Sequence, residues 1–219
     1  MRAFAELAAD PDPSLDELAL ALAAEFRPVD APAALELLDA LGADVRQAVE
    51  ETAGVPEAQA AACADVLGGE HGFAGDRKRY DDPANSMLDV VLSRRRGLPI
   101  LLSVVYVEAA RRAGVPLRGV GLPGHFVVGH FGTTPPLLLD PFARGAGLAA
   151  DDADAASLRP WSAREVAMRM LNNLLASYER RGDLGAAIHA AELRLALPAG
   201  EAVHDALAMQ ARGLKSRLN

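Results

Sequence analysis

The sequence predicts an α+β fold in which helices precede and follow a small antiparallel sheet. Apolar side chains recur at helical spacing before residue 114 and again after residue 161, whereas residues 117–140 form short runs with the period of strands. Hydrophobic residues make up 51% of the chain but aromatic residues only 5%, and a core filled mainly by alanine and leucine favours helices. We therefore expect one sizeable core built from both kinds of element.

Three helices are expected in the first 70 residues. Ser14 and Glu17 form a capping-box pattern ahead of a leucine-rich run. A second helix follows the sequence VDAP, and a third begins near Pro56 and ends at Gly68-Gly69. Cys63 lies on the apolar face of the third helix and is expected to act as a small buried hydrophobe; as the single cysteine it excludes an intramolecular disulfide.

The next segment leads through a loop into a short helix and then a long one. Asp82-Pro83 marks a turn, and Asn85 or Ser86 can cap a helix that runs to about Arg95. Pro99 occupies the first position of the longer helix, PILLSVVYVEAARRAG.

The helix that begins at Pro99 is expected to be central, because its first turns are apolar on all sides and a helix without a polar face is buried. Glu108, Arg111 and Arg112 indicate that it reaches the surface near its end. Ser103, one turn after Pro99, is expected to be buried and to bond back to the helix backbone.

Three strands are expected next, in LRGVGL, HFVVGHF and LLLD. In the second strand His125 and Val127 share one face, whereas Val128 and His130 share the other. Asp140 ends the third strand, so a hairpin can bring its carboxylate beside the His125 imidazole. A histidine oriented by an aspartate supplies two members of a nucleophilic triad, although such a pair can also be structural.

The C-terminal third is expected to be a helical hairpin and one further helix. Residues 143–160 are small, acidic and aperiodic, which indicates a surface connection. Ser162 and Glu165 cap the first helix of the hairpin. Residues at the offsets of a tetratricopeptide helix pair are Leu171, Leu174, Tyr178, Gly182, Ala187 and Ala191. We expect an N-terminal helical segment (1–75), an α+β core (76–145), a linker (146–160) and a tetratricopeptide-like segment (161–219).

Charge and composition restrict the function classes. The acids concentrate in residues 1–76 and the bases in residues 77–118, within a net charge of −8. Among these basic residues only Tyr80 offers an aromatic side chain that could stack on a base. We therefore expect the bases to pair with acids of the chain or to form a solvated rim, rather than a nucleic-acid surface. No metal or other cofactor is expected, because one cysteine and two histidines on opposite strand faces make no zinc site. The absence of a long apolar run and of a signal-peptide pattern predicts a cytoplasmic protein with no membrane contact.

Three stretches of the sequence resemble a known protein family: NSMLDVVLSRRRGLPILLSVVYVEAARRAGVPLRGVGLPGHFVV, LLLDPF and MRMLNNLLASYERRGDLGAAI. Over residues 30–200 the chain resembles the bacterial SirB-type family of transglutaminase-like proteins. The resemblance implies a papain or transglutaminase-like core with an appended tetratricopeptide-like segment. In that superfamily the catalytic cysteine stands at the start of the buried helix, shortly before a GIPAR-type exit.

Matching that exit to GVPLR places Pro99 at the cysteine position, and His125 and Asp140 at the histidine and aspartate positions. Proline supplies no nucleophile, and it also lacks the backbone N–H that helps to hold an oxyanion. Such a donor is worth roughly 3 kcal/mol.

The leading hypothesis is therefore a non-catalytic protein that binds a protein or peptide. The candidate groove residues are Tyr80, Asn85, Ser86, Arg96 and Ser103. One alternative is a hydrolase or acyl-transfer enzyme that uses His125 and Asp140 with water or a serine. Another is a scaffold that binds through the C-terminal helices.

Overall fold

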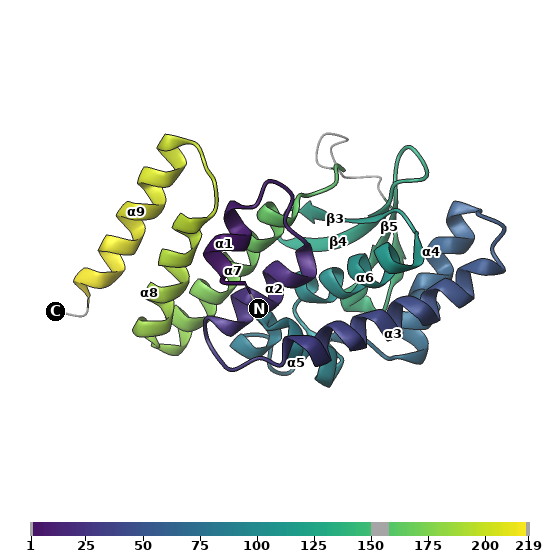
Figure 1. Cartoon of the computed structure of the whole chain (residues 1–219), viewed down its shortest axis with the longest axis horizontal. Coiled ribbons are helices and arrows are strands. Elements are labelled where there is room, and N and C mark those ends of the chain that lie inside the picture. The colour runs from purple at the N-terminus through teal and green to yellow at the C-terminus, as the bar shows by residue number, and fades with distance from the viewer. Residues whose placement is uncertain (1, 150–157, 218–219) are drawn as a thin grey trace.

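The computed structural model describes residues 2–149 and 158–217 and confirms the α+β class (Figure 1). The α-helices are α1 (Phe4–Ala9), α2 (Leu15–Ala24), α3 (Ala31–Glu50), α4 (Pro56–Ala64), α5 (Leu88–Arg94), α6 (Pro99–Ala113), α7 (Ala163–Arg181), α8 (Leu184–Leu193) and α9 (Glu201–Ser216). The strands are β1 (Ala74–Gly75), β2 (Arg96–Gly97), β3 (Leu117–Leu122), β4 (His125–His130), β5 (Leu137–Asp140) and β6 (Ala146–Leu148). The shorter helices are η1 (Asp65–Glu70, a π-helix) and the 3-10 helices η2 (Pro83–Ser86), η3 (Pro141–Ala143) and η5 (Arg194–Ala196).

The main sheet is antiparallel, with strand order β3-β4-β5-β6. The three predicted strands are present, and Gly124, with φ of 70°, lies in the tight turn between β3 and β4. β6 is a fourth strand that takes Ala146–Leu148, the start of the expected linker, into the sheet beside β5. Residues 150–157 of that linker lie outside the described residues.

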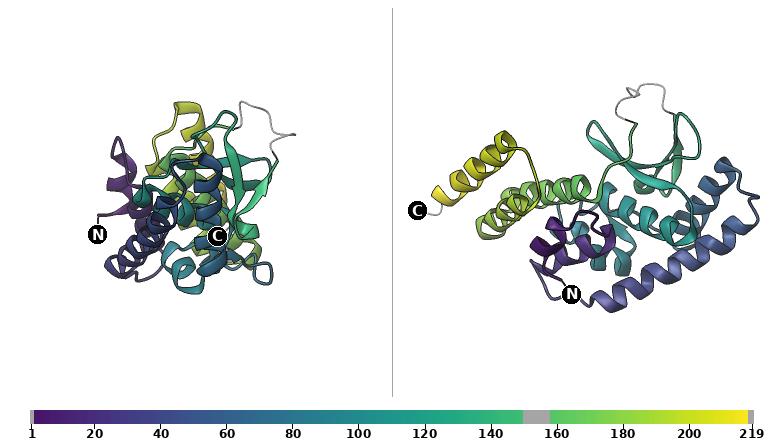
Figure 2. Two further views of the ribbon diagram at one scale, coloured as in Figure 1. Left: turned by 90° about the vertical axis from the view of Figure 1, so that its right-hand side faces the viewer. Right: turned by 45° about the horizontal axis from the view of Figure 1, so that its top comes forward.

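The two faces of β4 pack against different partners, as the period of a strand requires. Phe126 and Val128 belong to the main core, which also contains most of α6. Val127 lies on the other face and packs with Val120, Leu138 and Leu158. α6 is buried from Pro99 to Ala110 between the sheet and α3, which lies along it (Figures 1 and 2). The predicted central helix is confirmed.

The end of α6 differs from its prediction, because Glu108 is buried rather than at the surface. Its carboxylate lies 2.8 Å from Arg111 and 2.7 Å from Arg112. Arg112 also lies 2.6 Å from Asp16, which is buried on α2. Two buried carboxylates thus pair with two guanidinium groups where α2 meets α6, and the exposed carboxylate of Asp39 lies 2.6 Å from Arg112. This pairing permits burial.

Several predicted caps differ in detail. The Ser14 hydroxyl donates to Asp16 instead of capping α2. α5 begins at Leu88 after the η2 turn, and Asn85 and Ser86 are buried within that turn and do not cap α5. The Ser162–Glu165 capping box is confirmed at the start of α7.

α4, the third helix expected from the sequence, continues directly into η1, which contains Gly68. A Cβ at Gly68 would lie 2.1 Å from the Arg144 carbonyl oxygen, so only glycine permits this close approach of two backbones.

The C-terminal helices form the opposite end of the molecule from α4 (Figure 1). α7 and α8 pair as a hairpin around Gly182, whose φ of 73° is left-handed. α7 contacts α2 and η2, whereas α9 contacts α8 and η5 (Figure 2). The hairpin is therefore confirmed, and its relation to tetratricopeptide repeats stays a prediction. No helix within residues 2–149 and 158–217 is long and apolar enough to cross a bilayer.

Candidate functional site

His125 and Asp140 meet at one end of the sheet. His125 is the first residue of β4 and Asp140 the last of β5, and the antiparallel register that pairs Val128 with Leu139 brings these ends together. Nε2 of His125 lies 3.0 Å from Oδ2 of Asp140, with 31% and 13% of the two side chains exposed. The hairpin contact expected from the sequence is present, and it leaves Nδ1 of the imidazole as the nitrogen not engaged by Asp140.

The environment of Asp140 favours its ionised form. Burial by itself raises the pKa of Asp140, but the hydrogen bond and charge of His125, with the backbone N–H groups of Phe142 and Ala143, hold that pKa below its usual value. The N–H of Phe142 donates to Oδ1 at 2.9 Å. Asp140 is therefore a fixed carboxylate that orients the imidazole.

An aromatic side chain that sequence reasoning missed, Phe142, covers this pair. Its ring makes edge contacts with His125 (centroids 6.5 Å apart) and with Tyr80 (6.0 Å). The guanidinium carbon of Arg77 lies 5.3 Å from the centre of the Phe142 ring, a cation–π geometry. The LDPF motif contains Phe142 and was the available signal, but a phenylalanine in it is equally typical of core packing.

A groove of about 530 Å³ adjoins this aromatic cluster. Its lining comprises Arg77, Lys78, Arg79, Tyr80, Asp81, Asp82 and Arg181, and we call it the Tyr80 groove. Its carboxylates are engaged, since Asp81 lies 2.6 Å from Arg180 and Asp82 lies 3.5 Å from Arg94. Arg77, Lys78 and Arg181 have no carboxylate partner within the described part of the chain. Internal pairing thus neutralises this basic region only in part, and the groove is positively charged.

The other groove candidates lie deeper than expected. Asn85, Ser86 and Ser103 are completely buried, so they do not form a rim. Nδ2 of Asn85 donates to the Arg79 carbonyl at 2.6 Å and thereby holds the loop that carries Tyr80. Arg96 is half-buried and donates to the Gly72 carbonyl at 2.6 Å. Of the five candidates only Tyr80, 48% exposed, offers a largely free side chain.

Ser103 also departs from its predicted backbone bond, because its hydroxyl has no hydrogen-bond partner among the described residues. The same holds for Tyr106, three residues further along α6. Burial, followed by the charges of Cys63 and Asp140, raises the pKa of Tyr106. Both hydroxyls are enclosed in the interior and out of reach of a substrate.

Neither Pro99, which the resemblance places at the nucleophile position, nor the single cysteine offers a reactive nucleophile. Pro99 is the first residue of α6 and is buried, and the preceding Leu98 donates its N–H to the Asn85 carbonyl at 3.1 Å. Burial raises the pKa of the Cys63 thiol to about 12, so a thiolate is essentially absent at neutral pH. The predicted role of Cys63 as a buried hydrophobe is confirmed.

His130 is separate from the pair, on the opposite face of β4. It is buried, its Nε2 lies 3.0 Å from Oε1 of Gln59, and its Nδ1 accepts from the Gly132 N–H at 3.1 Å. Burial lowers the pKa of His130 and favours the neutral imidazole. No cluster of three or more possible metal ligands occurs in residues 2–149 and 158–217.

The α+β fold of the chain agrees with comparison to known proteins. The sequence profile of the Transglutaminase-like superfamily matches residues 32–176, from α3 into α7. The chain belongs to the transglutaminase-like superfamily.

Similar proteins with curated names add little about the role of this transglutaminase-like chain. It is 34% identical over 220 residues to a UPF0162 protein of Pseudomonas aeruginosa, covering 92% of this chain and 78% of that one. A UPF0162 protein of Xylella fastidiosa is 40% identical over 49% of this chain, but the match spans only 44% of that relative. F-box only protein 21 of Mus musculus is 32% identical over 50% of this chain and 20% of its own length. No solved structure shows significant similarity to the chain.

Proposed function

We propose that this chain is a non-catalytic transglutaminase-like protein that binds a protein or peptide partner in the cytoplasm. One observation carries the proposal: the His125–Asp140 pair is kept, while Pro99 stands at the start of α6, where the resemblance places the nucleophile. A proline supplies neither an attacking atom nor an oxyanion donor.

The other possible nucleophiles support a binding role. Cys63 is buried with a raised pKa, and Ser103 is enclosed within α6. Activation of either residue would require a base within hydrogen-bond reach and access for a substrate. Complete burial removes the second condition for both.

The Tyr80 groove is the binding surface that we propose for the partner. Tyrosine and arginine are the residue types that dominate binding energy in protein interfaces. Here an exposed Tyr80 is held by Phe142, and Arg77 is held over the same ring. The side chains are thus preorganised, which lowers the entropy lost on binding.

The proposal is tested by two measurements on the full chain. Wild-type protein should show no hydrolysis or acyl transfer with peptide amide donors. A partner recovered from the native host should bind the purified chain directly, and Tyr80→Ala should weaken that binding by about 2 kcal/mol. The control is Lys215→Ala on α9, outside the lining of the Tyr80 groove, and it should leave binding unchanged. Tyr178→Ala is unsuitable as a control, because Tyr178 packs on Phe26 and its loss would disturb the fold. Turnover by the wild type, or equal binding by Tyr80→Ala, would contradict the proposal.

A second candidate function is hydrolysis with His125 as a base on water. The ionised Asp140 and the partly exposed imidazole favour it. It requires turnover that disappears in His125→Ala, whereas the binding proposal requires none.

A third candidate is a scaffold that binds through the C-terminal helices. Val203 and Met209 are exposed apolar side chains on α9. A partner whose binding is lost in Met209→Glu and kept in Tyr80→Ala would favour this function. We also propose that the chain is of the SirB type and that α7 and α8 form a tetratricopeptide-like pair, because the two helices form a hairpin at Gly182, one of the positions at the offsets of such a pair.

A further inference from the structure

Arg194 is a buried arginine without a carboxylate partner among the described residues. It is the first residue of η5 and only 4% exposed. Nη1 donates to Oδ1 of Asn172 on α7 at 3.0 Å, and Nη2 donates to Oε1 of Gln210 on α9 at 2.9 Å. Both acceptors are neutral amides, and Nε has no hydrogen-bond partner in the described part of the chain. The guanidinium charge is therefore oriented but not balanced.

The positive charge of Arg194 is not compensated by nearby acids of the described residues. Burial lowers the pKa of Arg194, opposed by the charge of Glu179. Glu179, however, already lies 2.9 Å from Arg217. The other buried arginine network, around Arg112, contains three carboxylates, those of Asp16, Asp39 and Glu108. A buried cation that lacks such a partner is costly, and a bound anion would relieve that cost.

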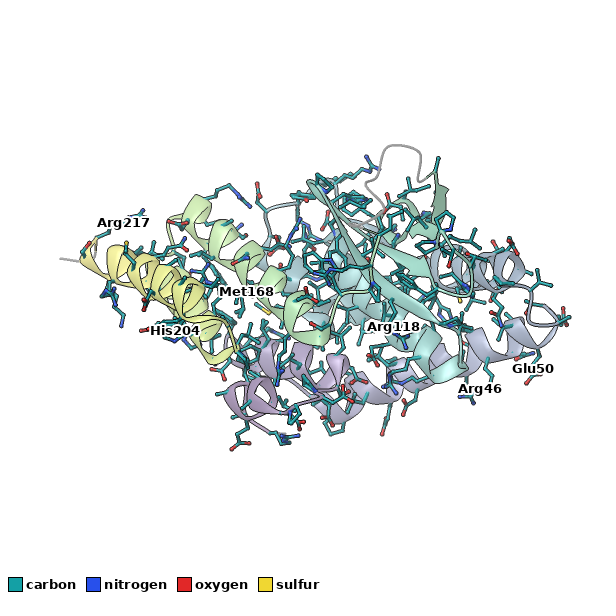
Figure 3. All side chains as sticks on the ribbon, turned by 90° about the horizontal axis from the view of Figure 1, so that it is seen from above. Arg46, Glu50, Arg118, Met168, His204 and Arg217 are labelled. Atoms are coloured by element: carbon teal, nitrogen blue, oxygen red, sulfur yellow. The ribbon has the colours of Figure 1, made fainter. Side chains whose placement is uncertain are left out.

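A groove of about 570 Å³ includes in its lining Asn172, the amide that accepts from Arg194. The other lining residues are Arg159, Trp161, Ser162, Arg164, Glu165, Met168, Arg169, Leu197 and Pro198, and we call it the Arg169 groove. In the view of Figure 3, Met168 lies between Arg118 of β3 and His204 of α9. The groove thus lies where the core meets the C-terminal helices.

The charge of this groove is positive. Glu165, its one carboxylate, is engaged by Arg159 at 3.1 Å and by the Ser162 N–H at 2.9 Å. Arg164 is held by backbone carbonyls of the N-terminal segment, with Nε 3.0 Å from the Ala8 oxygen. Arg169 makes no ion pair with any described residue.

We propose that the Arg169 groove binds an acidic peptide segment of a partner protein, with its carboxylates at Arg169 and at the Asn172 side chain that holds Arg194. The inference rests on the proposed binding function and names the chemistry of the partner. Guanidinium groups bind carboxylates through paired, charge-assisted hydrogen bonds. Met168 and Pro198 supply apolar contacts for the side chains between the acids, and the volume suits a segment of a few residues.

A nucleic acid fits the same surface less well. Trp161 is half-buried, with its ring 5.3 Å from Phe126, and Arg159 covers it at 5.9 Å. It is therefore not free to stack on bases, as single-strand binding requires. The net charge of −8 also repels a long polyanion more strongly than a short acidic peptide.

The test measures anisotropy of a fluorescein-labelled hexaglutamate peptide on titration with the full chain. The wild type should bind it, and should bind a hexaglutamine peptide far more weakly. Arg169→Gln should weaken hexaglutamate binding about tenfold or more, because a charge-assisted hydrogen bond is lost. Arg194→Lys keeps the charge but loses the two-amide geometry, and should also weaken binding. Arg212→Gln makes the same charge change at an exposed position of α9 and should leave binding unchanged.

Four results would overturn the inference. The first is no binding of hexaglutamate by the wild type, and the second is an equal loss of binding in Arg169→Gln and Arg212→Gln. The third is binding of hexaglutamine as tight as that of hexaglutamate. Tight binding of a labelled oligothymidylate without hexaglutamate binding would also overturn it. If hexaglutamate binding fails while a host partner still depends on Tyr80, this inference falls and the proposed function stands.

Discussion

Nε2 of His125 lies 3.0 Å from Oδ2 of Asp140, across the open end of the β4–β5 hairpin. The contact is stabilised on the aspartate side by the Phe142 N–H and on the histidine side by the Phe142 ring. An oriented imidazole thus occurs in a chain in which the resemblance places Pro99 at the nucleophile position.

Asp140→Asn should reduce the loss in the free energy of unfolding that the wild type shows as the pH falls below about 4. Because the pKa of Asp140 is lowered in the folded protein, its contribution to the free energy of unfolding is complete above the unfolded carboxyl pKa of about 3.9. That contribution is lost as the pH falls through the folded pKa. Urea unfolding between about pH 2.5 and pH 7 measures it. Asp205→Asn, at an exposed position on α9, is the control, and a wild-type profile in Asp140→Asn would contradict the assignment.

Arg112→Met should destabilise the fold strongly. Arg112 is the guanidinium shared by buried Glu108 and Asp16, and removal of one partner leaves buried charge unpaired at a cost of about 3–5 kcal/mol. Arg111 contacts the same two carboxylates, but its side chain is 52% exposed. Arg111→Met should therefore cost about 1 kcal/mol or less. Urea unfolding of the two variants measures the difference, and equal losses would show that the network is not buried as described.

Ser103→Ala should be neutral or stabilising. The Ser103 hydroxyl is buried with no hydrogen-bond partner among the described residues, so its removal relieves a desolvation cost of about 1–3 kcal/mol. Ser177 is the matched control, because it is buried and its hydroxyl donates to the Asp81 carbonyl. Ser177→Ala should be destabilising in the same thermal unfolding experiment. Fluorophosphonate labelling of wild-type protein that is lost in Ser103→Ala would contradict this account and favour a serine hydrolase.

Cys63 should be unreactive in the native protein. Its thiol is buried and its pKa is raised to about 12, whereas alkylation requires an accessible thiolate. Iodoacetamide should modify it only in denaturant. Modification at similar rates in buffer and in denaturant would show that the face of α4 opens readily.

The sequence predicted those elements whose pattern repeats over several residues. Strands β3, β4 and β5 follow from alternation, and α6 follows from an apolar run between Pro99 and Gly114. β6 has only three residues, all exposed, which is too short for a period to be visible. The His125–Asp140 contact was predictable because a hairpin joins neighbouring strands.

Contacts between residues far apart in the chain were not predictable in this way. Glu108 looked like a surface residue because its environment depends on Asp16, on a different helix. Asn85 and Ser86 have the composition of a cap, yet α7 packs over the η2 turn and buries them. Nothing in the sequence around Arg194 indicates that it is buried. Only the fold shows that its two hydrogen-bond partners are side-chain amides.

The alkylation rate of Pro99→Cys tests most directly whether Pro99 occupies a former nucleophile position. We predict that its new thiol reacts with iodoacetamide at neutral pH faster than the buried Cys63 thiol, because the resemblance places the His125 imidazole beside this position, where it would favour the thiolate. The double variant Pro99→Cys/His125→Ala should lose that acceleration, and the wild type, with only Cys63, supplies the background. Equal rates in the single and double variants would contradict the placement of Pro99 opposite His125, and with it the account of this chain as a transglutaminase-like protein without its nucleophile.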